Sequence, residues 1–431
     1  MRTDGLQLHN MPPLRIPFRF FITAPLFGIL SALLLLESGT AGWSSRWLPE
    51  IMAATHLLTL GFMATVMLGA LFQVLPVLSG QTIPGQRWLA PTVHLLLAGG
   101  ALALAVAFIN AEHIWQLAAM SLLGSGFSLF LGALGLRLIR LDTGGGDSIF
   151  AIRLAALALL VSLSLGIIML GAYTGIQIPH YLANNGIAHL RFALLGGVLL
   201  LIMGVSYQII PMFHVTPEYS GHLRKTLPAV IFAALTVLTI STIDWLNFAA
   251  ASALVLAAGI YALFSFYLFQ QRKRKIVDYT VRFWQLGLGC LSLALLGYLI
   301  EILEVARPSA VKELQWGILM IPGFAISIMI GVLYKIAPFL GWLHLQQACV
   351  QQPMAILKLP SMHDLLPVKR GRIQFWLHGL ALALLLCAAQ LPVISPLAAV
   401  ALAADFIWLE ISLVKVLRGY RRSMELVSDP K

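Results

Sequence analysis

Two histidines stand at matched depth in two apolar segments of the chain. His56 precedes Gly61 by five residues, and His189 precedes Gly196 by seven. Imidazole is the usual axial ligand of haem and a common ligand of copper. A bis-histidine haem needs two rings at equal depth on facing helices, with about 4 Å between the ligating nitrogens, because each metal–nitrogen bond is near 2 Å. The pair predicts a haem or metal site, and the alternative is two separate histidines hydrogen-bonded within a helix bundle.

Further residues could extend such a site. Arg191 occupies the position in the second segment that corresponds to the first histidine, and it could pair with haem propionates. His113 and His180 are predicted loop residues on the same side, and each could add a metal ligand. His94 and His378 each lie near the start of the helix that follows a repeated helix. They could bind a second haem, or they could be boundary residues.

Polar residues inside apolar segments are costly and usually have a function. Asp405 lies near the middle of the last apolar segment, which predicts a proton path or a salt bridge to a buried base. Gln73, Gln208 and Lys335 recur at one position of a repeat. They could form a polar lining, or they could satisfy carbonyls that nearby prolines leave free.

The composition identifies the class of protein that must position these side chains. Of 431 residues, 59% are hydrophobic and 10% are charged, with a mean hydropathy of +0.89. A soluble chain of this length would carry more charge. We therefore expect an all-α polytopic membrane protein that forms a single domain over residues 1–431. The three cysteines form no CxxC pair, and we interpret them as packing residues.

Runs of about 20 apolar residues predict twelve membrane-spanning helices. They cover about 18–36, 51–78, 90–109, 114–138, 151–175, 186–213, 226–246, 248–270, 280–302, 314–340, 373–391 and 395–418. With both termini cytoplasmic, the outer side keeps only Arg46, Arg191, Arg307 and Lys312 of the 28 basic residues. This asymmetry fits the positive-inside rule and predicts that both termini are cytoplasmic, and the location we expect is the bacterial inner membrane. The net charge of +11 is then a topology signal that contacts the lipid bilayer, and no nucleic acid is expected.

A spaced pattern recurs in predicted spans 2, 6 and 10. Each copy reads Gly-x7-Gly-x3-(Gln/Lys)-x2-Pro, starting at Gly61, Gly196 and Gly323. Glycines eight apart lie near one helical face and allow close approach of a neighbouring helix. The spacing predicts three parallel four-helix repeats around a pseudo-threefold axis. Residues 341–372 are predicted to form a cytoplasmic interfacial loop that could dock a partner.

Taken together, these features resemble the haem–copper oxidase subunit I superfamily. The residues that carry the resemblance are His56 followed by Leu-Leu-x-Leu-Gly-Phe, the ending Pro76-x-x-Ser79-Gly80, and the opening Pro17-Phe18-Arg19-Phe20-Phe21. Within that superfamily the chain is more similar to NnrS-type haem–copper membrane proteins than to respiratory oxidases. Oxidases of the superfamily carry histidines in helices 7 and 10, but 226–246 and 314–340 contain none. The oxygen-reducing binuclear centre is therefore not expected.

Three functional hypotheses follow. The first is a protein that binds haem b, and that could bind copper, with a redox or nitric-oxide-related role as the resemblance implies. Its partners would be respiratory or denitrification membrane proteins. The second is a small-solute transporter, in which Asp405 and the repeated polar residues line the route. The third is a non-catalytic partner in the assembly of respiratory complexes. A visible absorption spectrum separates the first from the others.

Overall fold

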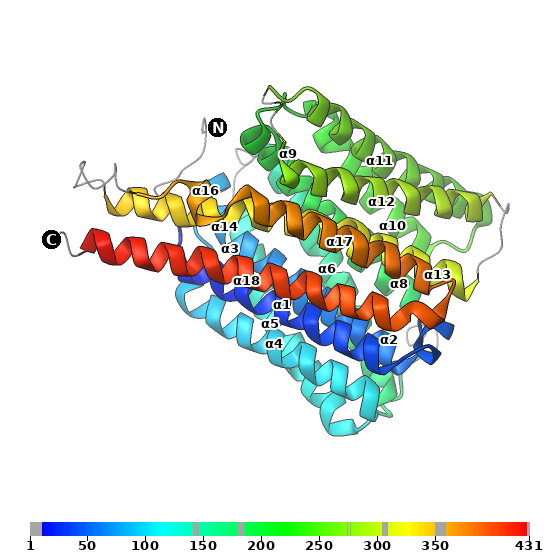
Figure 1. The fold of residues 1–431 in the computed structure, drawn as a ribbon. Helices are drawn as coiled ribbons and strands as arrows, with labels where there is room; N and C mark the ends of the chain where they lie inside the picture. Colours follow the sequence, from blue (N-terminus) through cyan, green and yellow to red (C-terminus); the bar gives the residue numbers. More distant parts are fainter. Residues whose placement is uncertain are drawn as a thin grey trace.

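Within the described residues, twelve apolar helices are each long enough to cross a membrane, which confirms the predicted number of spans. The computed structural model describes residues 11–140, 146–179, 185–273, 275, 277–303, 309–349 and 359–428, and no strand occurs among them. Figure 1 shows the long helices packed side by side. The chain is thus an all-α polytopic membrane protein. Nine spans are single α-helices: α1 (Arg15–Glu37), α4 (Gln86–Asn110), α5 (His113–Arg140), α6 (Gly146–Tyr173), α10 (Gly221–Ile240), α11 (Asp244–Gln270), α12 (Tyr279–Ile302), α17 (Val368–Ala388) and α18 (Ser395–Ser428).

The other three spans are composite, and each contains a π-helical segment between two α-helices. They are α2 (Pro49–His56), η3 (Leu57–Ala64) and α3 (Thr65–Ser79); α8 (Gly186–Arg191), η5 (Phe192–Val198) and α9 (Leu199–His214); and α13 (Ala310–Ile318), η6 (Leu319–Ile326) and α14 (Ser327–Ala348). Each π-helical segment begins four residues before the first repeat glycine, Gly61, Gly196 or Gly323. Because π-helical turns are rare and cluster at functional sites, this shared position gives the sequence repeat a counterpart in the backbone.

The repeat glycines pack against the preceding span in every copy. An added Cβ would lie 2.4 Å from a phenylalanine of α1 at Gly61 and 2.5 Å from an alanine of α6 at Gly196. At Gly323 it would lie 3.0 Å from a cysteine of α12. The second glycine of each copy contacts the same three helices. The predicted close approach of a neighbouring helix is therefore present in all three units.

The three composite spans form the interior of the bundle. In the most apolar stretch of each composite span, 78%, 83% and 78% of the residues are buried, whereas in the other nine spans the buried share is 28% to 50%. The segment η6 contacts both η3 and η5, so the π-helical turns meet inside the bundle. The first and last spans, α1 and α18, pack along each other (Figure 1). The residues that could do chemistry on these inner helices are thus held among tightly packed neighbours.

The predicted loop over 341–372 is wrong at both ends. The helix α14 continues through Pro338 to Ala348, and α17 already begins at Val368. A proline removes only one intrahelical hydrogen bond, and beyond it the buried Leu343 and Leu345 hold α14 against its neighbours. The short helix α16 (Met362–Leu365), with a capping box formed by the side chains of residues 361 and 364, lies between α14 and α17. Residues 350–358 lie outside the described part of the chain.

Candidate functional site

The side chain of His56 stands where α2 passes into η3. Its Nδ1 lies 2.8 Å from the carbonyl oxygen of Met52, one turn earlier in the same helix. A carbonyl oxygen only accepts, so Nδ1 carries the proton and a neutral imidazole keeps its lone pair on Nε2. The ring packs against Phe108 of α4, with the centroids 5.1 Å apart. The backbone thereby fixes the tautomer and orientation that metal ligation through Nε2 requires.

The second histidine, His189, is fixed in the same way by a different helix. Its Nδ1 lies 2.9 Å from the carbonyl oxygen of Ser162 in α6, and the hydroxyl of Ser162 lies 3.2 Å from the same nitrogen. One turn further along α6, Gly166 makes room for the ring, because an added Cβ would lie 3.1 Å from the His189 Cε1. Ser162 and Gly166 share one face of α6. We call this face of α6 the seat of the His189 imidazole, because Ser162 hydrogen-bonds the ring and Gly166 makes room for it.

The two predicted histidines come together across the bundle. The ring centroids of His56 and His189 are 6.4 Å apart, and the ring planes differ by 18°. Two bonds of about 2 Å to one metal ion, with about 1.1 Å from each ring nitrogen to its centroid, place the centroids of opposed imidazoles about 6.2 Å apart. Among the described residues, neither Nε2 has a hydrogen-bond partner. Ring separation and tautomer therefore both fit a bis-histidine metal or haem site.

Arg191 and His113, which were also predicted for this site, lie elsewhere. Arg191 follows His189 by two residues, about 200° around the helix. Its guanidinium contacts the carbonyl oxygen of Leu238 in α10 and the hydroxyl of Tyr298 in α12, both at 3.4 Å. The structure thus does not place it beside the histidine pair. His113 is exposed at the start of α5, and His180 lies outside the described residues.

The predicted second pair, His94 and His378, has separate partners. The Nε2 of His94 lies 2.9 Å from the hydroxyl of Thr23 in α1. Both ring nitrogens of His378 are hydrogen-bonded, Nδ1 to Asp405 at 2.7 Å and Nε2 to Ser327 at 2.8 Å. Because this histidine has no free nitrogen, we do not include it among the haem ligands proposed below.

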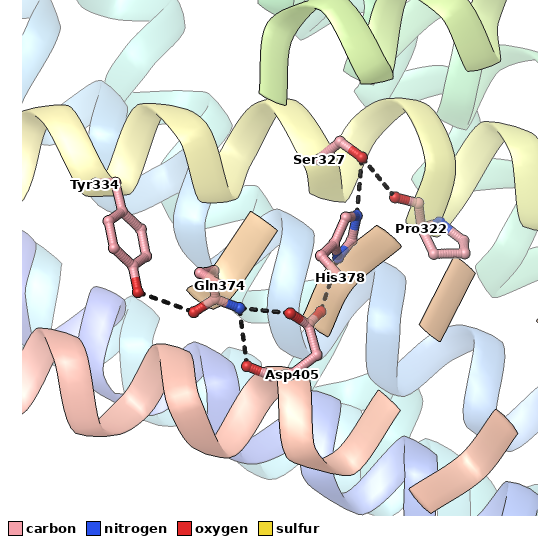
Figure 2. Close-up of polar contacts among 6 residues, drawn as sticks. All are labelled: Pro322, Ser327, Tyr334, Gln374, His378 and Asp405. Carbon is pink, nitrogen blue, oxygen red and sulfur yellow. Dashed lines mark hydrogen bonds and ion pairs between the residues drawn. The ribbon is translucent and has the colours of Figure 1, made fainter. Parts of the chain in front are cut away.

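The buried base predicted for Asp405 is His378. Figure 2 shows the two side chains facing each other between α17 and α18. The amide of Gln374 in α17 donates to the Asp405 carboxyl and to its backbone carbonyl, and the hydroxyl of Tyr334 in α14 donates to the amide oxygen. None of the four is more than 7% exposed. A buried charge needs a partner of this kind to be tolerated among apolar helices.

The repeated polar position does not form a hydrogen-bonded ring. Lys335 forms an ion pair with Asp278, with the ammonium nitrogen 3.1 Å from a carboxylate oxygen. His214 lies 3.8 Å from the same oxygen. The amide of Gln73 is buried, and neither of its polar atoms has a hydrogen-bond partner in the described structure. Gln208 is half-buried. The prediction that these residues line a route stays a prediction.

Several residues of both sites are not evident from the sequence. Ser162 and Gly166 are ordinary small residues of an apolar helix, and nothing in their spacing marks them. Ser327 is weakly indicated by the repeat, because it follows Gly323 by four residues, as Thr65 follows Gly61. Both hydroxyls hydrogen-bond the carbonyl five residues earlier, at 3.2 Å, which is the register of a π-helical turn.

Comparison with known proteins adds no identification to this geometry. No protein-family model matches the chain, and no curated protein sequence matches it significantly. The class of protein, an all-α polytopic membrane protein of twelve spans, follows from the structure itself.

Proposed function

We propose that the chain binds haem b between His56 and His189 and acts as a redox protein of the membrane. The observation that carries the proposal is the ring geometry, a centroid separation of 6.4 Å with ring planes 18° apart. Both Nδ1 atoms donate to backbone carbonyls, which leaves each Nε2 lone pair free for ligation. A haem bound there would supply one-electron redox chemistry.

The use of two protein ligands favours electron transfer over gas binding. His56 and His189 would both hold the haem, so the site would supply electron-transfer chemistry and would leave no ligand position open to a diatomic gas. The nitric-oxide-related role rests only on the resemblance to NnrS-type proteins. Addition of nitric oxide to the reduced protein separates the two roles. A spectrum that does not change upon addition supports electron transfer, and a shifted Soret band supports a gas-linked role.

The test is a reduced-minus-oxidised absorption spectrum of the protein purified from cells that supply haem. We expect a Soret band with sharp α and β bands in the wild type. His56→Ala and His189→Ala should each lose these bands, whereas the exposed His222 of α10 provides a matched control, His222→Ala, that keeps them. Metal analysis distinguishes iron from copper on the same pair.

Two outcomes contradict the proposal. A colourless wild-type protein from haem-sufficient cells would show that the chain has no haem site. Small-solute transport would then be the better-supported function, with the buried Asp405 on the transport route. A coloured protein whose spectrum survives in both alanine variants places the haem elsewhere.

A further inference from the structure

A second buried group of polar side chains lies apart from the haem ligands proposed above. His378 of α17, Asp405 of α18 and Ser327 of α14 are each at most 1% exposed. Figure 2 shows them in one connected line that ends on the carbonyl of Pro322 in η6. The positions of their protons can be derived from the hydrogen bonds.

The hydroxyl of Ser327 determines the protonation of His378 Nε2. The hydroxyl lies 3.2 Å from the Pro322 carbonyl oxygen, which can only accept, so its single proton is used there. The His378 Nε2 lies 2.8 Å from the same hydroxyl. When the hydroxyl donates to Pro322, Nε2 is the donor and carries a proton, and when the hydroxyl donates to Nε2, Nε2 is the acceptor.

The amide of Gln374 determines which oxygen of Asp405 can be protonated. One of its two N–H groups donates to Oδ1, and the other donates to the Asp405 backbone carbonyl 2.9 Å away. The amide oxygen accepts from Tyr334 at 3.0 Å, which fixes the amide orientation. The remaining oxygen, Oδ2, lies 2.7 Å from His378 Nδ1. One proton must lie between these two atoms. With Nε2 also protonated, the pair is electrically neutral whether the shared proton lies on Oδ2 or on Nδ1.

We propose that His378 and Asp405 form a proton-binding site inside the membrane-spanning bundle, with Ser327 linking its occupancy to η6. Release of the Nε2 proton to water leaves the pair with a charge of −1. The proton shared with Asp405 then lies on Nδ1 and bonds to the carboxylate, and Nε2 becomes an acceptor. The Ser327 hydroxyl turns from the Pro322 carbonyl to donate to Nε2. Only N–H and O–H bonds change, and no electrons are transferred.

The groups around the pair allow both states. From α17, Arg370 donates to the hydroxyl of Ser412, which Tyr334 of α14 also contacts, so a positive charge lies near the anionic form. From α12, the ring of Phe283 faces His378 and carries no charge. On α18, Glu410 is the next acid, five residues beyond Asp405. Among the described residues named here, the cation Arg370 is linked to the pair only through Ser412, Tyr334 and Gln374, so it makes no direct ion pair that would fix the deprotonated state.

The link to η6 gives the site a route to the rest of the bundle. The Pro322 carbonyl lies in the π-helical turn, and η6 contacts both η3 and η5. Loss of the Ser327 hydrogen bond leaves this carbonyl without its side-chain donor. Proton binding therefore changes the hydrogen bonding of the segment in which the inner helices meet.

Infrared difference spectra of the full-length protein in lipid nanodiscs, recorded between acid and alkaline pH, test the proposal. The wild type should show carboxyl and imidazole bands of one titrating pair. Asp405→Asn should lose them while keeping the fold, since an amide can donate to Nδ1 in place of the carboxylic acid. Glu410→Gln, in the same helix, is the matched control and should keep them.

A second variant keeps the test decisive if Asp405→Asn does not fold. The protonated pair has two hydrogen bonds through Ser327, and the deprotonated pair has one. Ser327→Ala removes this difference of one hydrogen bond, so the titration midpoint should fall by roughly half to one pH unit. Wild-type spectra without a titrating pair, or a midpoint unchanged in Ser327→Ala, would show that His378 and Asp405 form a permanent structural contact and would overturn the proposal.

Discussion

Substitution of Gly166 by alanine tests whether α6 positions His189 for ligation. The added Cβ would lie 3.1 Å from the ring Cε1 and 3.4 Å from Nδ1. Carbon atoms in contact prefer about 3.6 Å or more, so the ring must withdraw by about 0.5 Å. Metal–ligand distances vary by only about 0.2 Å, so the withdrawn ring would no longer reach the metal of the proposed haem with good geometry. We expect haem affinity to fall about 10- to 100-fold, which corresponds to about 1.4–2.8 kcal/mol.

The assay is a haem titration of the purified apoprotein, followed by the Soret absorbance. Gly259→Ala in α11 is the matched control, because an added Cβ there meets no atom within 4 Å. Alanine favours a helix over glycine by about 1 kcal/mol, so both variants should stay folded. If Gly166→Ala binds haem as tightly as Gly259→Ala and with the same spectrum, the seat on α6 does not position the ligand and the reasoning is refuted.

Three further predictions concern stability and reactivity. Gly331→Ala, where the Cβ would lie 2.7 Å from a phenylalanine carbon of α12, should lower stability by about 1–3 kcal/mol in thermal unfolding, whereas Gly297→Ala, with open space, should not. Burial raises the pKa of the Asp278 carboxyl, but Lys335 and its other partners outweigh burial and hold this pKa below its usual value. The contribution of the Asp278 carboxylate to stability is therefore present at neutral pH and lost as the pH falls through the lowered pKa. If the melting temperature of Lys335→Met falls with acid as steeply as that of the wild type, this prediction is contradicted. Cys387 lies exposed near the end of the spanning helix α17 and should react with a membrane-permeant thiol reagent in the folded protein, whereas the two buried cysteines should react only after unfolding.

The sequence predicted the architecture well because membrane proteins obey a few strong physical rules. The apolar runs specify the twelve spans, since a bilayer demands long helices with internally satisfied backbone groups. The repeated glycines predicted close helix contacts, and all six contact a neighbouring helix. The loop over 341–372 was misplaced because its bounds came from the ends of the apolar runs, and α14 and α17 both continue beyond those runs. How far a helix continues there depends on the packing of the residues beyond the run, which no local pattern contains.

For the candidate sites too, the sequence predicted some features and could not predict others. The depth of His56 and His189 could be predicted from their positions in two similar helices, because rise per residue fixes depth. Their face-to-face approach could not, since it depends on how α2 and α8 are rotated and on the seat that α6 provides. For Asp405, the cost of burying a charge predicted a partner without naming it. Arg191 shows the converse, because its equivalence to His56 in the repeat did not bring it to the same neighbours.

The sequence by itself thus determined the class of protein, its number of spans, the close helix contacts at its repeated glycines and the presence of polar groups that need partners. These follow from hydrophobicity, helix periodicity and the cost of buried charge, all of which act along the chain. Only the tertiary structure decided which partners meet, namely His56 with His189 and Asp405 with His378. Contacts between residues 27 and 133 positions apart depend on helix rotation and packing, which local sequence does not encode.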